Sequence, residues 1–383
     1  MSIKRRNRDQ FVFSLYYAAL FSSVAIVLPH FPRWLEAEGL SAEQVGIVLT
    51  AAFVGKLFFG PLFSTFADMS GTRKIWLILL CSSYLLAIVA LYFAVGFAVI
   101  FVVWAIGGSL VTTQIPLSDS MSVLAVKQRE LDYGSARLWG SISFIVVSMV
   151  TGYFFNLFGD AYILPALTLF AAFALVVTGL LPNLKAQRGR SASRAFLTTL
   201  GIADFRIFIV IAALVMGSHA TLYGFATIHW SALGLSEFEI GVLWAMGVIV
   251  EVIVFAYGTR LVSRLNISGL LTIAVVGGTL RWWSLGVTTD LIPLMLIQVL
   301  HACTFAVIHL AVVSYIARRI PDHLSASAQG IYDVLGNGIF FIAAMGLALL
   351  VFPEYQGKAF WPMAMLTVIA GIILAFNPQR FNR

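Results

Sequence analysis

The chain alternates between long apolar segments and short polar turns. Each apolar segment is about long enough to cross a bilayer core of roughly 30 Å, which takes about 20 residues of helix. The segments lack the ~10-residue dyad alternation that is typical of a β-barrel. We therefore expect an all-α membrane protein with twelve transmembrane helices. The segments lie at about 11–35, 43–66, 75–95, 97–125, 139–157, 161–182, 206–231, 240–262, 268–288, 291–317, 326–352 and 358–377.

The basic residues test this count, because the cytoplasmic loops of membrane proteins are enriched in Lys and Arg. Most of the 24 Lys and Arg lie in every second loop or near the two ends, whereas the intervening loops hold only Arg33 and Lys358. This alternation requires an even number of spans and predicts that both termini are cytoplasmic. The basic residues assigned to the cytoplasmic side are Lys4, Arg5, Arg6, Arg8, Arg73, Lys74, Lys127, Arg129, Arg137, Lys185, Arg188, Arg190, Arg194, Arg206, Arg260, Arg264, Arg318, Arg319, Arg380 and Arg383.

The composition supports the same class and excludes others. Hydrophobic residues make up 60% of the 383 positions, charged residues only 11%, and the mean hydropathy is +0.95. A soluble chain of this length would need more polar residues to cover its surface. The net charge of +7 follows the membrane topology and does not indicate nucleic acid. Cys81 and Cys303 lie inside apolar segments, which argues against a disulfide framework. The apolar run from Phe11 to Trp34 is too long for a signal peptide, so we expect an uncleaved first helix.

One long polar stretch divides the chain. Residues 183–205 are rich in basic and small residues and lie between the sixth and seventh apolar segments. We interpret this stretch as a cytoplasmic linker between an N-terminal six-helix half, residues 1–182, and a C-terminal six-helix half, residues 206–383. A role as a membrane sensor is not supported, because the sequence shows no appended soluble domain. We expect a monomer that spans the bacterial inner membrane many times.

Ionisable side chains inside the apolar segments are the main functional signal. Each costs at least ~2.5–3.5 kcal/mol near the bilayer centre and usually faces the interior of a helix bundle. Three acids and three bases suggest paired charges in one cavity, as transport of a polar substrate and of protons would need. A structural role stays open for several of them, because long basic side chains can snorkel to the membrane surface. The candidates are Asp119, Glu251, Asp333, Lys56, Arg137 and Arg281, together with His301.

Catalytic and metal sites are not indicated. His301 and His309 are eight residues apart and His219 and His229 ten apart, which is not the spacing of metal ligands on one helix. The chain also lacks the phosphate-binding G-x-x-x-x-G-K-[ST] motif of an ATP-driven pump. We therefore expect no enzyme, no metal and no cofactor, with a proton gradient as the source of energy.

The turn after the second segment carries a first family resemblance. It reads S-T-F-A-D-M-S-G-T-R-K from Ser64 to Lys74, and it resembles the loop motif of the major facilitator superfamily. The motif's leading glycine is Ser64 here, and the counterpart after the eighth segment is degenerate. The resemblance implies the major facilitator fold and a gating role for this loop. The gating residues would be Asp68, Gly71, Arg73 and Lys74.

The start of the fifth segment resembles lactose permease. The segment L-D-Y-G-S-A-R-L-W-G at 131–140 matches the permease segment with its substrate-binding arginine, which falls on Arg137, and the partner acid falls on Asp119. Arg281 and His301 fall on the arginine and histidine near the permease's coupling site. Phe144 replaces the tryptophan that stacks on the sugar. The permease's proton-carrying glutamate is replaced by Thr304.

The differences from lactose permease change which residue we expect to carry the proton. The permease's lysine on the tenth helix is Gln298 here, and its partner acid is missing as well, so no orphan charge remains. The permease's glutamate on the eighth helix falls on Val248, and Glu251 lies about one turn further on the same face. We therefore expect Glu251 to carry the proton, tuned by Arg281 and His301.

Four stretches resemble the bacterial 3-phenylpropionic acid transporter group more closely. They are L-D-Y-G-S-A-R-L-W-G-S, Y-G-F-A-T-I-H-W, G-V-I-V-E-V-I-V-F-A and L-I-Q-V-L-H-A-C-T-F. The resemblance implies a small aromatic carboxylate as substrate. A basic residue inside the second segment, Lys56, suits a carboxylate better than a neutral sugar.

Our hypothesis is therefore a proton-coupled symporter of a small organic acid such as 3-phenylpropionate. Lys56 and Arg137 would hold the carboxylate, with Asp119 orienting Arg137, and the aromatic side chains of Phe144, Tyr223 and Trp244 would flank the ring. The alternative on the same scaffold is a proton-coupled symporter of a neutral oligosaccharide or nucleoside. A drug exporter is a further transport alternative, although its pocket usually carries fewer fixed charges.

Overall fold

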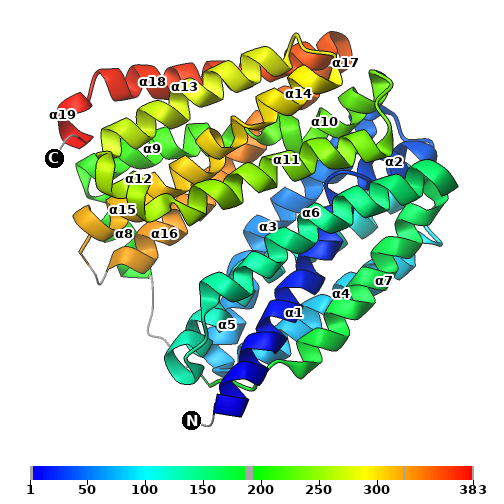
Figure 1. Ribbon diagram of the computed structural model, residues 1–383, viewed down its shortest axis with the longest axis horizontal. Helices are drawn as coiled ribbons and strands as arrows, with labels where there is room; N and C mark the ends of the chain where they lie inside the picture. Colours follow the sequence, from blue (N-terminus) through cyan, green and yellow to red (C-terminus); the bar gives the residue numbers. More distant parts are fainter. Residues whose placement is uncertain (1–2, 186–192, 322–323, 382–383) are drawn as a thin grey trace. The chain divides into compact units, whose positions relative to one another are not determined.

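The computed structural model of the chain describes residues 3–185, 193–321 and 324–381 (Figure 1). In these three ranges all the regular elements are helices, and the β pairing consists of an isolated antiparallel bridge between Thr72 and Lys185. The all-α prediction is therefore confirmed for the described residues.

The contacts divide the chain into two compact units. The first contains Met1–Gly189 together with Gly234–Ala245, and the second contains Arg190–Leu233 together with Met246–Arg383. Helix α11 (Glu237–Ala256) thus begins in the first unit and ends in the second. The predicted division into two six-helix halves, residues 1–182 and 206–383, remains a prediction.

In the first unit, helix α1 packs on α6 and α7, α5 packs on α3 and α4, and α4 packs on α7. Local polar signals set the helix ends. Ser41 and Gln44 form a capping box at the start of α3, and Asp132 caps α6 by accepting hydrogen bonds from the Ser135 amide and hydroxyl. The Ser135 hydrogen bonds hold the pKa of the Asp132 carboxyl below its ordinary value. The helices are α1 (Ile3–Val27), α2 (Phe31–Ala37), α3 (Ala42–Ser70), α4 (Arg73–Leu91), α5 (Phe97–Arg129), α6 (Tyr133–Phe158), η1 (Asp160–Tyr162) and α7 (Ile163–Leu180).

The second unit contains α13 packed on α18, and α9 packed on α17 and α18. Its core is a cluster of buried aliphatic and aromatic side chains, among them Phe208, Leu271, Val312 and Tyr315. Two short segments, η2 and η4, are π-helices. The elements besides the end of α11 are α8 (Ser193–Leu200), α9 (Ala203–Gly217), α10 (Ala220–Ala232), α12 (Gly258–Arg264), α13 (Ile267–Leu285), α14 (Leu291–Gln298), η2 (Cys303–Val307), α15 (Ile308–Arg319), α16 (Ser325–Val334), η4 (Leu335–Ile339), α17 (Phe340–Tyr355), η5 (Gln356–Phe360), α18 (Trp361–Ala375) and α19 (Pro378–Phe381).

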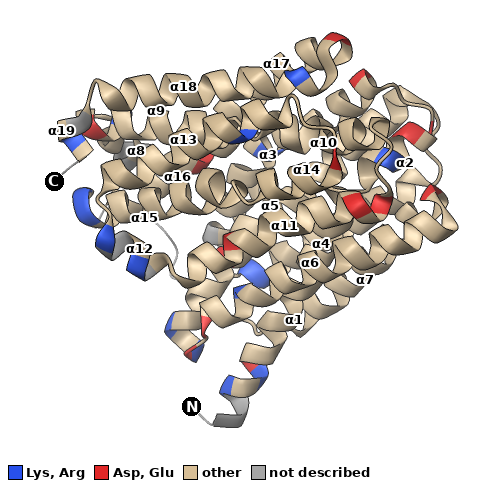
Figure 2. Cartoon of the chain, turned by 45° about the horizontal axis from the view of Figure 1, so that its top comes forward, with Lys and Arg blue, Asp and Glu red and all other residues tan. Residues whose placement is uncertain are grey.

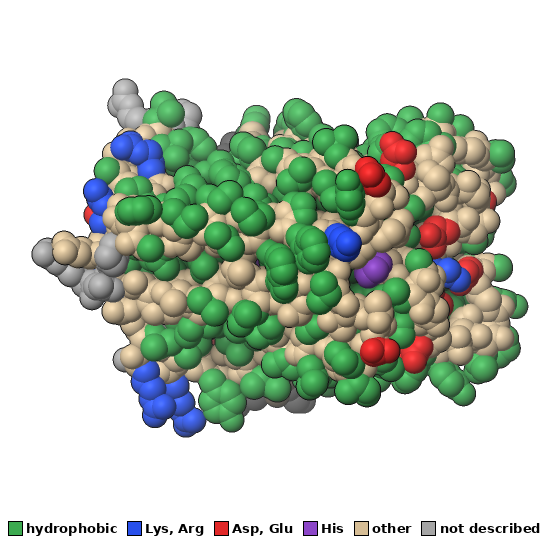
Figure 3. All heavy atoms as spheres, turned by 90° about the horizontal axis from the view of Figure 1, so that it is seen from above, with side chains coloured by type: hydrophobic (Ala, Val, Ile, Leu, Met, Phe, Trp, Pro, Cys, Tyr) green, Lys and Arg blue, Asp and Glu red, His purple; other side chains and the backbone are tan. Residues whose placement is uncertain are grey.

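The helices are long and apolar enough for a membrane protein. Ten candidate spans are found among the described residues, and the last of them, Ser327–Ala375, covers 49 residues and several successive helices. The exact number of crossings therefore stays a prediction. In Figure 2 most of each ribbon is free of charge, and basic residues gather in α12, at the end of α15 and in α19. On the face drawn in Figure 3, hydrophobic side chains predominate and charged ones are few.

Small residues allow α3 and α5 to approach closely. A Cβ atom added at Gly108 of α5 would lie 2.6 Å from the Ala52 Cβ of α3, which is far inside van der Waals contact. A Cβ added at Gly55 of α3 would lie 1.9 Å from the Ser109 Oγ. Helix packing within membranes commonly relies on such small side chains.

We expect Gly108→Ala to lower the thermal stability of the purified protein in detergent. The added methyl group must separate α3 from α5, and overpacking of this kind costs typically about 1–3 kcal/mol. Gly60→Ala is the matched control, because a Cβ at Gly60 meets nothing within 4 Å. The unfolding temperature of the Gly60 variant should equal or exceed that of the parent, since alanine is the better helix former. Equal losses in both variants would contradict the packing argument.

Candidate transport sites

Asp119 is held by tyrosine hydroxyls in the first unit. Its Oδ1 accepts hydrogen bonds from Tyr17 of α1 at 2.7 Å and from Tyr133 of α6 at 3.1 Å. The Tyr17 hydroxyl also lies 2.9 Å from the Ser122 hydroxyl of α5. Three helices thus converge on one carboxylate. Sequence analysis selected Asp119 but missed Tyr17, although a pair of tyrosines inside an apolar helix is a visible signal.

Arg137 lies on aromatic rings rather than on Asp119. Its guanidinium carbon is 4.0 Å from the centre of the Phe21 ring and 5.5 Å from that of the Tyr17 ring. Among the described residues it makes no ion pair, so the predicted direct orientation by Asp119 is not present here. Tyr17 connects the two groups instead, because its ring lies against Arg137 while its hydroxyl binds Asp119. The faces of aromatic rings attract cations, and this attraction leaves the hydrogen-bond donors of Arg137 available.

The other predicted residues of the first unit lie in the same helix bundle. Lys56 is half-buried in α3, whereas Phe144 in α6 and Trp244 in α11 are almost completely buried. Phe144 follows Arg137 by seven residues, so both side chains project from one face of α6. The structure therefore places Phe144 on the face that carries Arg137.

The predicted gating loop ties three helices together. Gly71 ends α3 with φ of 70°, a left-handed conformation that favours glycine. The Arg73 Nε donates to the Ser120 hydroxyl of α5 at 2.7 Å, and the Lys74 Nζ donates to the Gly179 carbonyl of α7 at 2.7 Å. The Asp68 side chain lies outside the described part of the structure. A role in gating remains a prediction.

Arg281 is the most deeply buried charge of the second unit. Its side chain has no solvent exposure, and its guanidinium lies 4.4 Å from the Trp282 ring. The Nη1 donates to the Thr304 hydroxyl at 3.0 Å, and the Nη2 donates to the Gln298 Oε1 at 2.8 Å. Among the described residues Arg281 makes no ion pair with an acid, and its Nε has no hydrogen-bond acceptor. The positive charge is thus solvated by neutral groups alone.

His219 extends this polar chain. Its Nδ1 lies 3.0 Å from the Met216 carbonyl and therefore carries a hydrogen, while its Nε2 lies 3.1 Å from the Thr304 hydroxyl. The Thr304 hydroxyl accepts from Arg281, and its single hydrogen can go either to the His219 Nε2 or to the His301 carbonyl at 3.2 Å. At His219 the helix is interrupted between α9 and α10. Discontinuous helices of this kind form the binding sites of many transporters. Sequence analysis did not select His219.

Glu251 and His301, the two residues expected to take part in proton coupling, approach one another. The His301 Nε2 is 3.7 Å from the Glu251 Oε2, and the His301 ring lies 5.6 Å from the His219 ring, centre to centre. The Nδ1 of His301 is buried without a hydrogen-bond partner. His301 directly precedes the π-helix η2, a kind of element that often occurs at functional sites.

The two remaining predicted residues of this unit, Tyr223 and Asp333, make contacts outside the Glu251–His301 pair. The ring centre of Tyr223 is 6.1 Å from that of His219 and 5.9 Å from that of Phe341. The Asp333 Oδ1 accepts a hydrogen bond from the Asn337 amide at 3.0 Å, next to the π-helix η4. Tyr223 therefore lies beside the His219 chain, and Asp333 is held by a local hydrogen bond.

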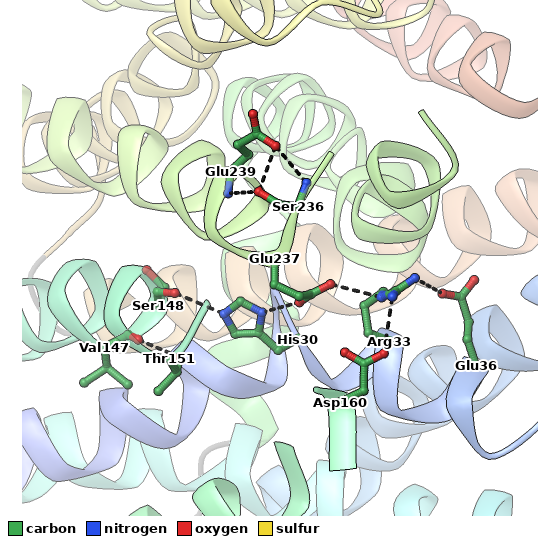
Figure 4. Close-up of polar contacts among 10 residues, drawn as sticks. All are labelled: His30, Arg33, Glu36, Val147, Ser148, Thr151, Asp160, Ser236, Glu237 and Glu239. Atoms are coloured by element: carbon green, nitrogen blue, oxygen red, sulfur yellow. Dashed lines mark hydrogen bonds and ion pairs between the residues drawn. The ribbon is translucent and has the colours of Figure 1, made fainter. Parts of the chain in front are cut away.

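A buried ion network at the start of α11 is the feature that sequence analysis missed most clearly (Figure 4). The His30 Nδ1 lies 2.7 Å from the Glu237 Oε2, and the Arg33 Nε lies 3.0 Å from the Glu237 Oε1. Arg33 also reaches Asp160 at 3.2 Å and Glu36 at 3.8 Å. Sequence analysis did not select His30, which lies between Pro29 and Pro32. Its acidic partner is 207 residues away in the sequence.

Comparisons with known proteins agree with this architecture. The family model described as "MFS_1 like family" matches residues 11–373. The chain belongs to this family. It is 34% identical over 364 residues to the "Probable 3-phenylpropionic acid transporter" of Escherichia coli (strain K12), with 87% of this chain and 93% of the relative covered. It is 23% identical over 376 residues to the "Maltose permease" of Geobacillus stearothermophilus, with 96% and 94% covered.

Solved structures show the same fold at low sequence identity. The nucleoside transporter NupG superposes with a TM-score of 0.80 at 15% identity, covering 96% of this chain and 99% of that structure. The D-xylose-proton symporter superposes with a TM-score of 0.74 at 14% identity, covering 98% of each. The chain is thus a major facilitator transporter and a multi-pass protein of the bacterial inner membrane.

Arg281 should be dispensable for stability. We expect Arg281→Met to leave the unfolding temperature in detergent unchanged or slightly higher, because a hydrophobic side chain of similar size avoids the cost of dehydrating an unpaired charge. Arg33→Met is the control, since it removes the cation of the buried Glu237 carboxylate and of the partly exposed Asp160 carboxylate and should lower the unfolding temperature. A large loss in the Arg281 variant alone would contradict this assignment.

Proposed function

We propose that this protein is a proton-coupled symporter of a small aromatic carboxylate such as 3-phenylpropionate, which it moves by alternating access. One observation carries the proposal. Each unit holds a guanidinium on a long apolar helix, Arg137 in α6 and Arg281 in α13, that makes no ion pair among the described residues. Arg281 is fully buried and Arg137 is half-buried, and a cation without an acid partner favours an anionic ligand over a neutral one.

Arg137 supplies the features that a phenyl carboxylate needs. Its guanidinium can bind a carboxylate through two parallel hydrogen bonds, and the Phe21 ring beneath it leaves its edge free for this contact. We assign Lys56 as a second cation for the carboxylate and Phe144, Tyr223 and Trp244 as aromatic contacts for the ring. The name of the relative from Escherichia coli supports this class of substrate.

The proton would be carried by Glu251, with His301 as its neighbour at 3.7 Å. We assign Arg281 to the same site as a buried cation that would interact with this pair through its charge. No cofactor is needed, since the proton gradient supplies the energy. The sugar-proton symporter with the same fold supports the coupling mode.

We propose that the protein crosses the membrane twelve times and that both of its termini are cytoplasmic. The loop that contains Asp68, Gly71, Arg73 and Lys74 would then lie on the cytoplasmic side and act as a gate. Its hydrogen bonds to α5 and α7 are contacts that a gate can break and remake. We propose that the protein works as a monomer.

Proton-coupled transport of a neutral sugar or nucleoside is the alternative. The similarity to the maltose permease and the fold shared with the nucleoside transporter support it. In that case Asp119 and Arg137 would bind hydroxyl groups, and Lys56 would be structural.

Uptake into vesicles tests the proposal. We expect 3-phenylpropionate to accumulate when the pH gradient is imposed and not when it is absent. Glu251→Gln should abolish gradient-driven accumulation but retain exchange of labelled for unlabelled substrate, because the neutral amide fixes the protonated state. Accumulation without a gradient, or unchanged coupling in the variant, would overturn the mechanism.

A second pair of measurements identifies the substrate class. Arg137→Gln should raise the half-saturating concentration of 3-phenylpropionate about 10- to 100-fold, the loss expected for a charge-assisted hydrogen bond of ~1.5–3 kcal/mol. Lys56→Gln should weaken carboxylate uptake in the same direction. If the parent protein takes up maltose or a nucleoside and Lys56→Gln spares that uptake, the alternative replaces the proposal.

A further inference from the structure

His30 lies between two oxygen acceptors at the base of the network drawn in Figure 4. Its Nε2 is 3.0 Å from the Ser148 carbonyl of α6, and its Nδ1 is 2.7 Å from the Glu237 carboxyl of α11. A peptide carbonyl can only accept, so Nε2 carries a hydrogen. A neutral imidazole would then turn the lone pair of Nδ1 toward a carboxylate oxygen. The contact is attractive only if a further proton lies between His30 and Glu237.

The surrounding charges favour that proton. Arg33 is the cation that Glu237, Asp160 and Glu36 share, so the described cluster has more acids than bases. Burial, together with the neighbouring Glu237 and Asp160, raises the pKa of the Glu36 carboxyl against the effect of Arg33.

The remaining neighbours of His30 do not supply another cation. Glu239 of α11 turns away to accept hydrogen bonds from the Ser236 amide and hydroxyl, both at 2.8 Å. On the side of α6, the described groups that face His30 are the Ser148 carbonyl, Thr151 and the Phe155 ring, and none of these titrates near neutral pH. The imidazole itself has no solvent exposure. Glu237 is buried as well, whereas Arg33, Glu36 and Asp160 are partly exposed. A proton at Nδ1 therefore balances the Glu237 charge where little water is available.

The first turns of α11 pack against α6 so closely that the two backbones are nearly in contact. A Cβ atom added at Gly152 of α6 would lie 2.5 Å from the Glu237 carbonyl oxygen. A Cβ added at Gly241 of α11 would lie 2.5 Å from the Ser148 carbonyl oxygen. Two glycines on opposite helices thus permit the approach that brings Glu237 to His30. Any movement of the start of α11 away from α6 must break the His30–Glu237 contact.

We propose that the His30–Glu237 pair is a proton-binding site that locks the first turns of α11 onto α6 and onto the start of α2. The docked state holds one proton on the pair. When the two groups separate, the shared proton loses its second partner and can leave to water. Docking is therefore coupled to proton uptake, and rising pH weakens it by at most about tenfold per pH unit. The site is separate from the proton carrier assigned to Glu251.

Spin labels on α6 and α11 test the proposal on the full-length protein in lipid nanodiscs. Tyr153 and Phe238 form an exposed edge-to-face pair with ring centres 6.1 Å apart, so labels at Tyr153→Cys and Phe238→Cys report docking. Cys81→Ser and Cys303→Ala remove the native thiols. The dipolar coupling between the labels is then measured from pH 5.5 to pH 8.5 (roughly one unit below to two units above the ordinary pKa of histidine). We expect the docked fraction to fall as the pH rises.

Three variants test whether the pH dependence comes from the His30–Glu237 pair. In Glu237→Gln the amide can donate to the Nδ1 of a neutral His30, so docking should persist and lose its pH dependence. In His30→Gln the pH dependence should also disappear. His229→Gln is the matched control: His229 is a buried histidine of the second unit that makes no ion pair among the described residues, and its variant should behave like the parent.

Two results would overturn the proposal. One is a docked fraction in the parent that does not change with pH. The other is an unchanged pH dependence in Glu237→Gln or in His30→Gln. The measurement uses neither substrate nor a proton gradient. A failure of coupled uptake therefore leaves this proposal intact, and a failure of pH-dependent docking leaves the proposed symport intact.

Discussion

A guanidinium or carboxylate that leaves water loses solvation worth many kcal/mol, and inside a membrane protein only other protein groups can replace it. This cost determines where the charges of the chain lie and what surrounds them. Arg281 is solvated by a hydroxyl, a side-chain amide and an indole ring, and Asp119 by two tyrosine hydroxyls. Both charges are therefore stabilised by neutral partners. Because neutral partners do not cancel a charge, they leave it able to interact with an ion that arrives and departs.

The network around Arg33 solves the same problem in the opposite way. There a cation faces three carboxylates, and His30 completes the cluster with both ring nitrogens bound. Pairing of opposite charges makes such a cluster costly to open one member at a time, since the loss of Arg33 or His30 leaves the buried Glu237 carboxylate with one partner fewer. A cluster of this kind fits a contact that is either fully made or fully broken. The unpaired charges on Arg137 and Arg281 fit ligand binding better.

The sequence alone identified the helical membrane class and the positions of the buried charges, because both follow from local hydrophobicity. Asp119, Arg137, Glu251, Arg281 and His301 were all chosen as charges within apolar segments. Their partners were not predictable, since Tyr17 meets Asp119 across 102 residues and Glu237 meets His30 across 207. Glu237 and Arg33 also lie at helix ends, where a charge is ordinarily solvated by water and gives no signal. The expected pairing of Asp119 with Arg137 illustrates the limit: the two residues were both found, but the tyrosine ring between them was not.

The two histidine–glutamate pairs show how packing decides the use of identical chemistry. His30 and Glu237 are in hydrogen-bond contact, and the second nitrogen of the histidine is bound to a carbonyl. His301 and Glu251 are 3.7 Å apart, and the second nitrogen of His301 has no partner. The first pair gains its full stabilisation only when it holds a proton and α11 is docked, so protonation and conformation are linked there. The second pair is more loosely held, because its two groups lie beyond hydrogen-bond distance. A loosely held pair fits the carrier role that we propose for Glu251, whereas a closely bonded pair fits a lock.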